Sequence, residues 1–258
     1  GVALNAQPFV ADEQGRFRGE IKIPAQAARG PLAVAVAADG AAVADLELKI
    51  SEKLPLVGAD GYTLEQNKLQ SGLYQAALGE GVVYVTSAFG PPDQAGLLKV
   101  DARTLKITDS AAPPASKAWG QERKEGERTP PPVYSIFGAA ADPVAHTIWV
   151  SNTVNDTAAV YRQGDLSLLR QFEDGVVPHA RAVEVDGERG KAYVAAYGTG
   201  QVAVFDTRTL QHLKDIEIKA TQDGQEFGAI GLALDAASGA LYVASMKSPE
   251  VARISTAD

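Results

Sequence analysis

Residues 191–194 have the sequence Lys191-Ala192-Tyr193-Val194, in which an aromatic residue follows a small one and precedes a β-branched one, as is typical of a β-strand. Similar segments recur along the chain as Val82-Val83-Tyr84-Val85, Thr147-Ile148-Trp149-Val150 and Ala240-Leu241-Tyr242-Val243. The interval is 65 residues from Tyr84 to Trp149, 44 from Trp149 to Tyr193 and 49 from Tyr193 to Tyr242. A repeat of about 40 to 50 residues indicates β-propeller blades, with an insertion in the longest interval.

A turn precedes each aromatic segment. Asp142, Asp186 and Asp235 each lie seven residues before the aromatic residue, and the first copy has Ala77 at that place. The composition of hairpin turns is present at Asp142-Pro143, at Asp186-Gly187 and at Ala237-Ser238-Gly239. Each unit is therefore predicted to open with a hairpin that joins an innermost strand to the aromatic strand.

Two further strands are predicted in each unit. Residues 201–206 have the sequence Gln-Val-Ala-Val-Phe-Asp, in which apolar residues recur with a period of two, and this indicates a strand. Asp206-Thr207-Arg208-Thr209-Leu210 then makes a turn into a fourth strand, and a near-copy stands earlier as Asp101-Ala102-Arg103-Thr104-Leu105. Four short antiparallel strands per unit predict an all-β chain that contains a partial β-propeller.

The repeat resembles the YVTN-repeat β-propellers of bacterial extracytoplasmic proteins. The matching segments are Tyr193-Val194-Ala195-Ala196 with the strand and turn at 202–209, and Trp149-Val150-Ser151-Asn152. The resemblance covers about residues 69–258 and departs from the pattern at Tyr161-Arg162-Gln163-Gly164-Asp165, where the family has Ile-Asp. It implies seven blades, of which about four fit here, so we expect the chain to be a fragment whose other blades follow Asp258.

The N-terminal region differs from the repeats. Residues 5–17 resemble bacterial immunoglobulin-like modules, with a turn at Asp12-Glu13-Gln14-Gly15, and further strands are predicted at 20–24, 32–38 and 41–50. We expect a truncated β-sandwich over 1–50 and a linker over 51–70. The blades are then predicted at 71–110, 133–174, 178–219 and 226–258, with an insertion loop at 111–132.

Composition limits the function classes. The 258 residues are 45% hydrophobic and carry a net charge of −8, which disfavours nucleic acid as a partner without excluding it. No apolar run is long enough for a membrane span. Without cysteine the chain has no disulfide and no thiolate ligand, and we expect any export signal to have been cleaved or to lie outside this sequence.

No cofactor or metal site is predicted. Gly198-Thr199-Gly200 starts a G-x-G-x-x-A pattern, but a strand follows it where a dinucleotide site needs a helix. The histidines, His146, His179 and His212, fall in different blade elements, and for His146 and His212 a solvated surface position is favoured. No hydrolase motif with a nucleophile or metal is present, so no catalytic residue is predicted.

Propeller ligands generally bind at the mouth of the central channel, where the loop before each innermost strand and the loop after each second strand open together. Counted from the aromatic repeat, the strand-start positions are Gln70, Ser135, His179 and Gly228. Two residues further on stand Gly72, Phe137, Arg181 and Ile230. The insertion, which contains Trp119, is expected to overhang this mouth or to be a tolerated surface loop.

The candidate ligand-binding residues are Gln70, Trp119, Ser135, Phe137, His179 and Arg181. A cation beside aromatic rings can receive an anionic or aromatic ligand, although a polar lining hydrated by water has the same residues. We expect a non-catalytic periplasmic or extracellular scaffold that binds a protein, a peptide, a cell-envelope component or nucleic acid. The alternative is a propeller enzyme, lactonase-like or quinone-dependent, completed by blades outside this chain.

Overall fold

The computed structural model describes residues 4, 7–38, 40–51, 61–88, 94, 96–117, 120 and 131–256, apart from the side chain of Ala42. The chain divides into two compact units, residues 1–64 and 65–258. Within the described residues, strands are the main regular secondary structure of both units, and no helix is long and apolar enough to cross a membrane.

The first unit contains one described sheet, in which β1 (Gly30–Ala38) pairs with β2 (Ala41–Ile50) as an antiparallel hairpin. The predicted turn near Gly15 is present, and the Asp12 Oδ1 atom accepts hydrogen bonds from the backbone of Gln14 and Arg16. The strand predicted at 20–24 is wrong, because this segment has no ladder partner. A sandwich needs two packed sheets, so the immunoglobulin-like module stays a prediction.

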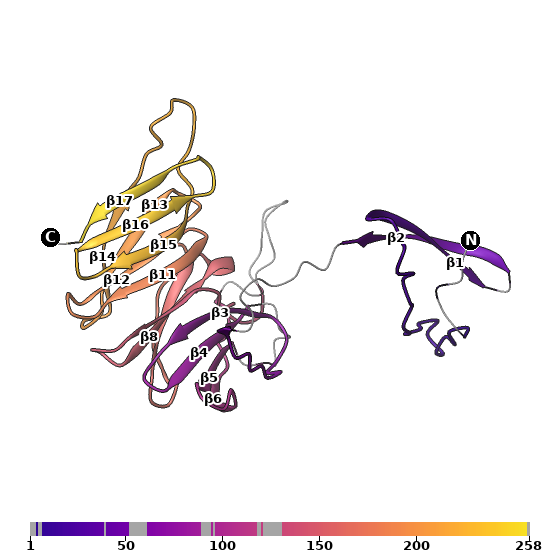
Figure 1. The fold of residues 1–258 in the computed structure, drawn as a ribbon. Helices are drawn as coiled ribbons and strands as arrows, with labels where there is room; N and C mark the ends of the chain where they lie inside the picture. Colours follow the sequence, from indigo (N-terminus) through magenta and orange to yellow (C-terminus); the bar gives the residue numbers. More distant parts are fainter. Residues whose placement is uncertain are drawn as a thin grey trace. The chain divides into compact units, whose positions relative to one another are not determined.

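The second unit consists of four antiparallel sheets whose strands follow chain order, here called blades 1 to 4 (Figure 1). Blade 1 contains β3 (Leu73–Leu78), β4 (Val82–Ser87), β5 (Leu97–Asp101) and β6 (Ile107–Ala111). Blade 2 contains β7 (Ala139–Asp142), β8 (Thr147–Asn152), the 3₁₀ turn η2 (Thr153–Asn155), β9 (Thr157–Arg162) and β10 (Leu168–Gln171). Blade 3 contains β11 (Ala180–Asp186), β12 (Lys191–Ala196), β13 (Gln201–Asp206) and β14 (Gln211–Glu217). Blade 4 contains β15 (Ala229–Asp235), β16 (Ala240–Ser245) and β17 (Val251–Ser255).

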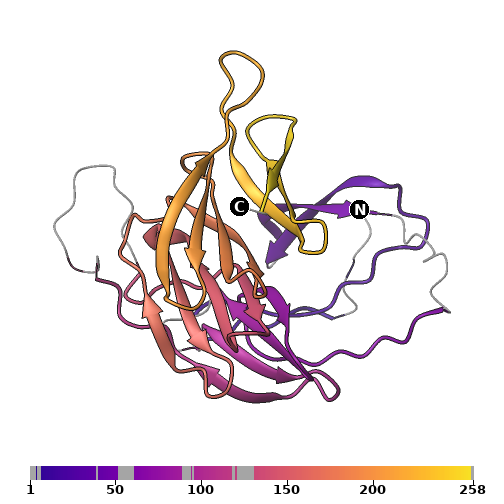
Figure 2. The ribbon, with the colours of Figure 1, turned by 90° about the vertical axis from the view of Figure 1, so that its left-hand side faces the viewer.

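The first strands of neighbouring blades contact one another, β3 with β7, β7 with β11, and β11 with β15. The blades therefore stack as an arc with these inner strands on one side, which Figures 1 and 2 show from two directions. This arrangement confirms the all-β class and the partial propeller, with three four-stranded blades and one three-stranded blade among the described residues.

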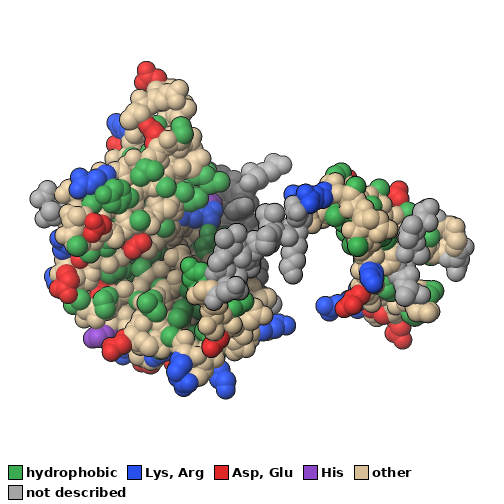
Figure 3. Space-filling model, in the orientation of Figure 1, with side chains coloured by type: hydrophobic (Ala, Val, Ile, Leu, Met, Phe, Trp, Pro, Cys, Tyr) green, Lys and Arg blue, Asp and Glu red, His purple; other side chains and the backbone are tan. Residues whose placement is uncertain are grey.

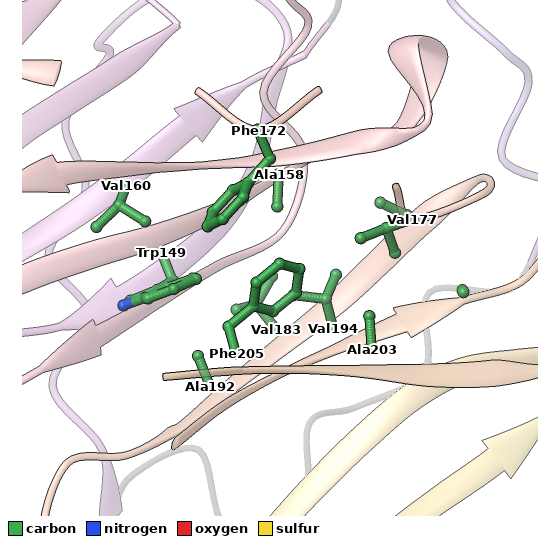
Figure 4. Packing of buried hydrophobic residues seen from close by; sticks show 12 residues of the cluster. Trp149, Ala158, Val160, Phe172, Val177, Val183, Ala192, Val194, Ala203 and Phe205 are labelled. Atoms are coloured by element: carbon green, nitrogen blue, oxygen red, sulfur yellow. The ribbon is translucent and has the colours of Figure 1, made fainter. Parts of the chain in front are cut away.

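The repeated aromatic residue packs against the next blade. Trp149 lies 5.8 Å from the Phe172 ring and 5.5 Å from the Phe205 ring, in a cluster drawn from blades 2 and 3 (Figure 4). Tyr84 and Tyr193 occupy the corresponding places in the clusters between blades 1 and 2 and between blades 3 and 4. Burying a large apolar side chain stabilises a fold by roughly 1.5–3 kcal/mol, so these residues hold the arc together.

The turns repeat as well as the strands. The side chains of Asp142, Asp186 and Asp235 accept backbone hydrogen bonds within the inner hairpins. In the outer turns Leu105, Leu166 and Leu210 all have φ between 53° and 54°, and each N–H donates to the carbonyl four residues earlier. Blade 2 therefore makes the same outer turn as its neighbours although its sequence at 161–165 differs from theirs.

Candidate ligand-binding site

The predicted mouth is held together by one recurring backbone contact. In blades 1, 3 and 4 a residue after the second strand donates its N–H to a carbonyl at the start of the inner strand. These bonds are Ala88 to Gly72 (2.9 Å), Gly198 to Pro178 (3.0 Å) and Met246 to Gly228 (2.9 Å). In blade 2 the Asn152 side chain donates to the Ser135 carbonyl at 3.2 Å. The two sets of loops therefore open on the same side of the blades, and we call this side the mouth.

The strand register corrects the sequence alignment of blade 1. Glu184 pairs with Tyr193, nine residues later, whereas Ala77 pairs with Tyr84, only seven residues later. The first hairpin is thus two residues shorter than the others. Gly72 rather than Gln70 therefore takes the strand-start position of blade 1, directly before β3, and Tyr74 rather than Gly72 takes the position two residues further on.

With this register, four residues occupy equivalent positions in the four blades. Each lies three residues before the inner-strand residue that pairs with the repeated aromatic residue. They are Tyr74, Phe137, Arg181 and Ile230. The register shifts at this place in β3, β11 and β15. In blade 2 the Phe137 N–H donates to the Ser151 carbonyl, and the Ser151 N–H donates to the Gly138 carbonyl. Each blade thus has a β-bulge here, a feature that re-aims a side chain out of the strand alternation.

Three of these four residues contact one another across blades 1 to 3. The Tyr74 and Phe137 rings meet edge to face at 5.1 Å. The Arg181 guanidinium carbon lies 6.0 Å from the Phe137 ring centroid, and Nη1 donates to the Tyr74 hydroxyl at 3.3 Å. Phe137 is 4% exposed and Tyr74 is 45% exposed, so the cluster is buried at Phe137 and accessible to solvent at Tyr74.

His179 extends the cluster toward blade 4. Its Nε2 atom lies 2.8 Å from Nη2 of Arg181, and because a guanidinium only donates, Nε2 accepts and the proton of the neutral ring is on Nδ1. The backbone of His179 has φ 54°, a left-handed conformation that disfavours any residue with a Cβ. Its N–H donates to the Asp156 carboxylate at 2.6 Å, which fixes this conformation.

The next contacts cross to blade 4. The His179 and Tyr197 rings are 5.3 Å apart, and the Lys247 ammonium lies 5.3 Å from the Tyr197 ring centroid. Lys247 also pairs with Glu226 at 2.6 Å, which lowers the pKa of the Glu226 carboxyl and raises the pKa of the Lys247 ammonium. We call Tyr74, Phe137, His179, Arg181, Tyr197 and Lys247 the mouth cluster.

A hollow adjoins the Lys247 end of the mouth cluster. It has a volume of about 510 Å³ and is lined by Gly198, Thr199, Lys247 and much of the segment 218–227. This segment leads from β14 to β15, so the hollow lies between blades 3 and 4 on the mouth side.

Hydrogen bonds between neighbouring blades hold the backbone around the cluster. The Thr86 hydroxyl donates to the Phe137 carbonyl, and the Thr153 hydroxyl donates to the Ala180 carbonyl, each at 2.5 Å. At Gly138 an added Cβ would lie 2.3 Å from the Arg181 carbonyl oxygen, so only glycine permits this approach of β7 and β11. The mouth cluster is therefore carried by rigid elements.

The insertion begins and ends beside the mouth of blade 2. An isolated bridge joins Ala115 to Val133, and the Asn155 side chain donates to the Ser116 hydroxyl at 2.8 Å. Tyr134 donates to Asp174 at 2.7 Å, and burial together with this contact raises the pKa of Tyr134 to about 12. Both ends of the insertion are thus anchored near the 3₁₀ turn η2 on the mouth side.

The structure brings together only some of the binding residues predicted from the sequence. Phe137, His179 and Arg181 are brought together, as expected. Ser135 contributes its carbonyl to the loop contact, Gln70 lies three residues before β3, and Trp119 lies outside the described residues. Tyr74, Tyr197 and Lys247 were missed, Tyr74 because of the shorter hairpin, while Tyr197 and Lys247 lie in loops already assigned to the mouth. No group of three or more potential metal-binding side chains occurs in the described part of the chain.

Comparison with known proteins gives the fold only. No protein-family model and no curated protein sequence matches the chain. Hydrazine synthase from Kuenenia stuttgartiensis is similar in structure with a TM-score of 0.54 and 15% identity, covering 79% of this chain and 50% of that one. A chain of a nidogen/laminin complex has a TM-score of 0.50 and 17% identity, covering 72% and 61%. The β-propeller domain of Swd1 from Myceliophteria thermophila has a TM-score of 0.46 and 11% identity, covering 67% and 49%. The chain thus spans between half and two thirds of the length of the first two proteins.

Proposed function

We propose that this chain is a non-catalytic, extracytoplasmic β-propeller scaffold that binds a protein or peptide at its mouth. The observation that carries the proposal is the setting of Arg181. Its guanidinium is partly buried among two aromatic rings and a neutral histidine, and its Nε atom is buried without a hydrogen-bond partner. Cationic and aromatic side chains together are the anchors that dominate many protein interfaces.

The construction of the mouth supports binding by a preorganised surface. The bulges, the threonine bonds between blades and the close approach at Gly138 hold the cluster in one arrangement before a ligand arrives. A preorganised surface loses less conformational entropy on association, which favours affinity.

The comparisons support the choice of a macromolecular ligand. One structurally similar chain comes from a complex of nidogen with laminin. A mouth that extends over four blades also offers more surface than a small molecule needs. The location outside the cytoplasm is part of the proposal, and its support is the sequence resemblance to YVTN-repeat proteins.

The proposal can be tested by selecting peptides from a phage-displayed random library on the immobilised full chain. We expect selected peptides to bind the wild-type chain and to bind Arg181→Ala at least about tenfold more weakly, as is usual for an interface anchor. The control is Arg208→Ala, which removes an exposed arginine from the β13–β14 turn at the opposite rim of blade 3. Failure to select any peptide, or equal loss of binding in both variants, would contradict the proposal.

A further inference from the structure

The mouth cluster contains a cation without an opposite charge. The Arg181 hydrogen bonds go to a phenol and to an imidazole, both neutral acceptors. Of the carboxylates in the described ranges of the chain, none forms an ion pair with Arg181, whereas the other cation of the cluster, Lys247, is paired with Glu226. The Asp156 carboxylate accepts a hydrogen bond from the backbone N–H of His179. The cluster therefore has one positive charge to offer a ligand.

We infer that Arg181 binds a single carboxylate group of a peptide, with an apolar or aromatic group of the same peptide lying against Tyr74. This inference rests on the proposed function and names the ligand group. A guanidinium has five N–H donors, of which two are directed to Tyr74 and His179, so its Nη groups retain hydrogens for a ligand. The planar donor pair of arginine matches the planar oxygen pair of a carboxylate.

The charge of the site favours a carboxylate over a phosphate. A phosphate monoester brings a charge of about −1.5 to −2 at neutral pH, which one arginine does not balance. The surroundings favour a ligand with an apolar part, since the Tyr74 ring, which contacts both the guanidinium and Phe137, is 45% exposed. An acidic residue next to an aromatic residue, or an aromatic residue at a free C-terminus, has both features.

Three dipeptides of nearly the same composition test this inference by NMR titration of the full chain. Acetyl-Phe-Asp-amide has a side-chain carboxylate, acetyl-Asn-Phe has a C-terminal carboxylate, and acetyl-Phe-Asn-amide has neither. We expect saturable binding of at least one acid below about 10 mM and binding of the neutral dipeptide at least about tenfold weaker, because a charge-assisted hydrogen bond pair is lost. Which acid binds distinguishes a side-chain carboxylate from a chain end.

Variants of the chain locate the binding. Arg181→Ala should weaken the acid about tenfold to a hundredfold, Arg181→Lys should weaken it less, and Arg208→Ala should not change it. Equal binding of the neutral and acidic dipeptides, no saturable binding of either acid, or unchanged affinity in Arg181→Ala would overturn the inference. If library peptides bind through Arg181 while the acids do not, the inference fails and the proposed function stands.

Discussion

At the scale of single residues, the inner strands of the four blades repeat one pairing geometry with different side chains. The position that pairs with the repeated aromatic is Ala77, Ala140 and Ala233 in three blades and Glu184 in the other. The Glu184 side chain is partly buried, and this burial raises the pKa of its carboxyl. The charged form of this side chain is thus disfavoured in the folded state.

Glu184→Gln should stabilise the chain at neutral pH. Because the folded-state pKa is above the ordinary value, the folded state binds a proton more tightly than the unfolded state, and stability falls as the pH rises through this range. The melting temperature of Glu184→Gln should therefore exceed that of the wild type at pH 7, and the difference should vanish below the ordinary pKa of about 4.3. Thermal unfolding monitored by circular dichroism across this range measures it. A constant difference at all pH values would show that packing and not ionisation is responsible.

At the scale of the blade, the same aromatic position has different surroundings at the end of the arc. Tyr84, Trp149 and Tyr193 are at most 3% exposed because a further blade covers each, whereas Tyr242 of blade 4 is 40% exposed. Figure 3 shows hydrophobic side chains gathered over the part of the surface formed by this blade. The stability contributed by the repeated aromatic therefore depends on the neighbouring blade and not on the sequence motif alone.

Paired truncations test this dependence. Tyr193→Ala removes a side chain from a closed cluster and should lower the free energy of unfolding by about 3–5 kcal/mol, as in other buried aromatic truncations. Tyr242→Ala should lower it by about 1 kcal/mol or less, because the ring is partly solvated already. Urea denaturation of both variants gives the comparison, and similar losses at the two positions would contradict the role assigned to the covering blade.

The blades also show which features could be predicted from sequence. Period-two alternation and the Asp turns predicted the strands of blades 1 to 4, because each depends on local backbone chemistry. The site depends on the β-bulges at Tyr74, Arg181 and Ile230. No characteristic residue type marks these bulges in the sequence, and each interrupts the period-two alternation of its strand. Counting from Tyr84 without knowing the length of the first hairpin therefore gave Gln70 and Gly72 in place of Gly72 and Tyr74.

At the scale of the whole molecule, the chain divides into two compact units, and the residues of the mouth cluster all belong to the second. Every described contact of the mouth cluster joins residues of the second unit. The three hydrophobic clusters between blades also consist only of residues of this unit. Residues 65–258 should therefore fold alone and bind the acidic dipeptide with the affinity of the full chain. Expression of this segment, a cooperative thermal transition and the same NMR titration would measure both properties. A segment that folds but binds about tenfold more weakly would mean that residues 1–64 take part in the site.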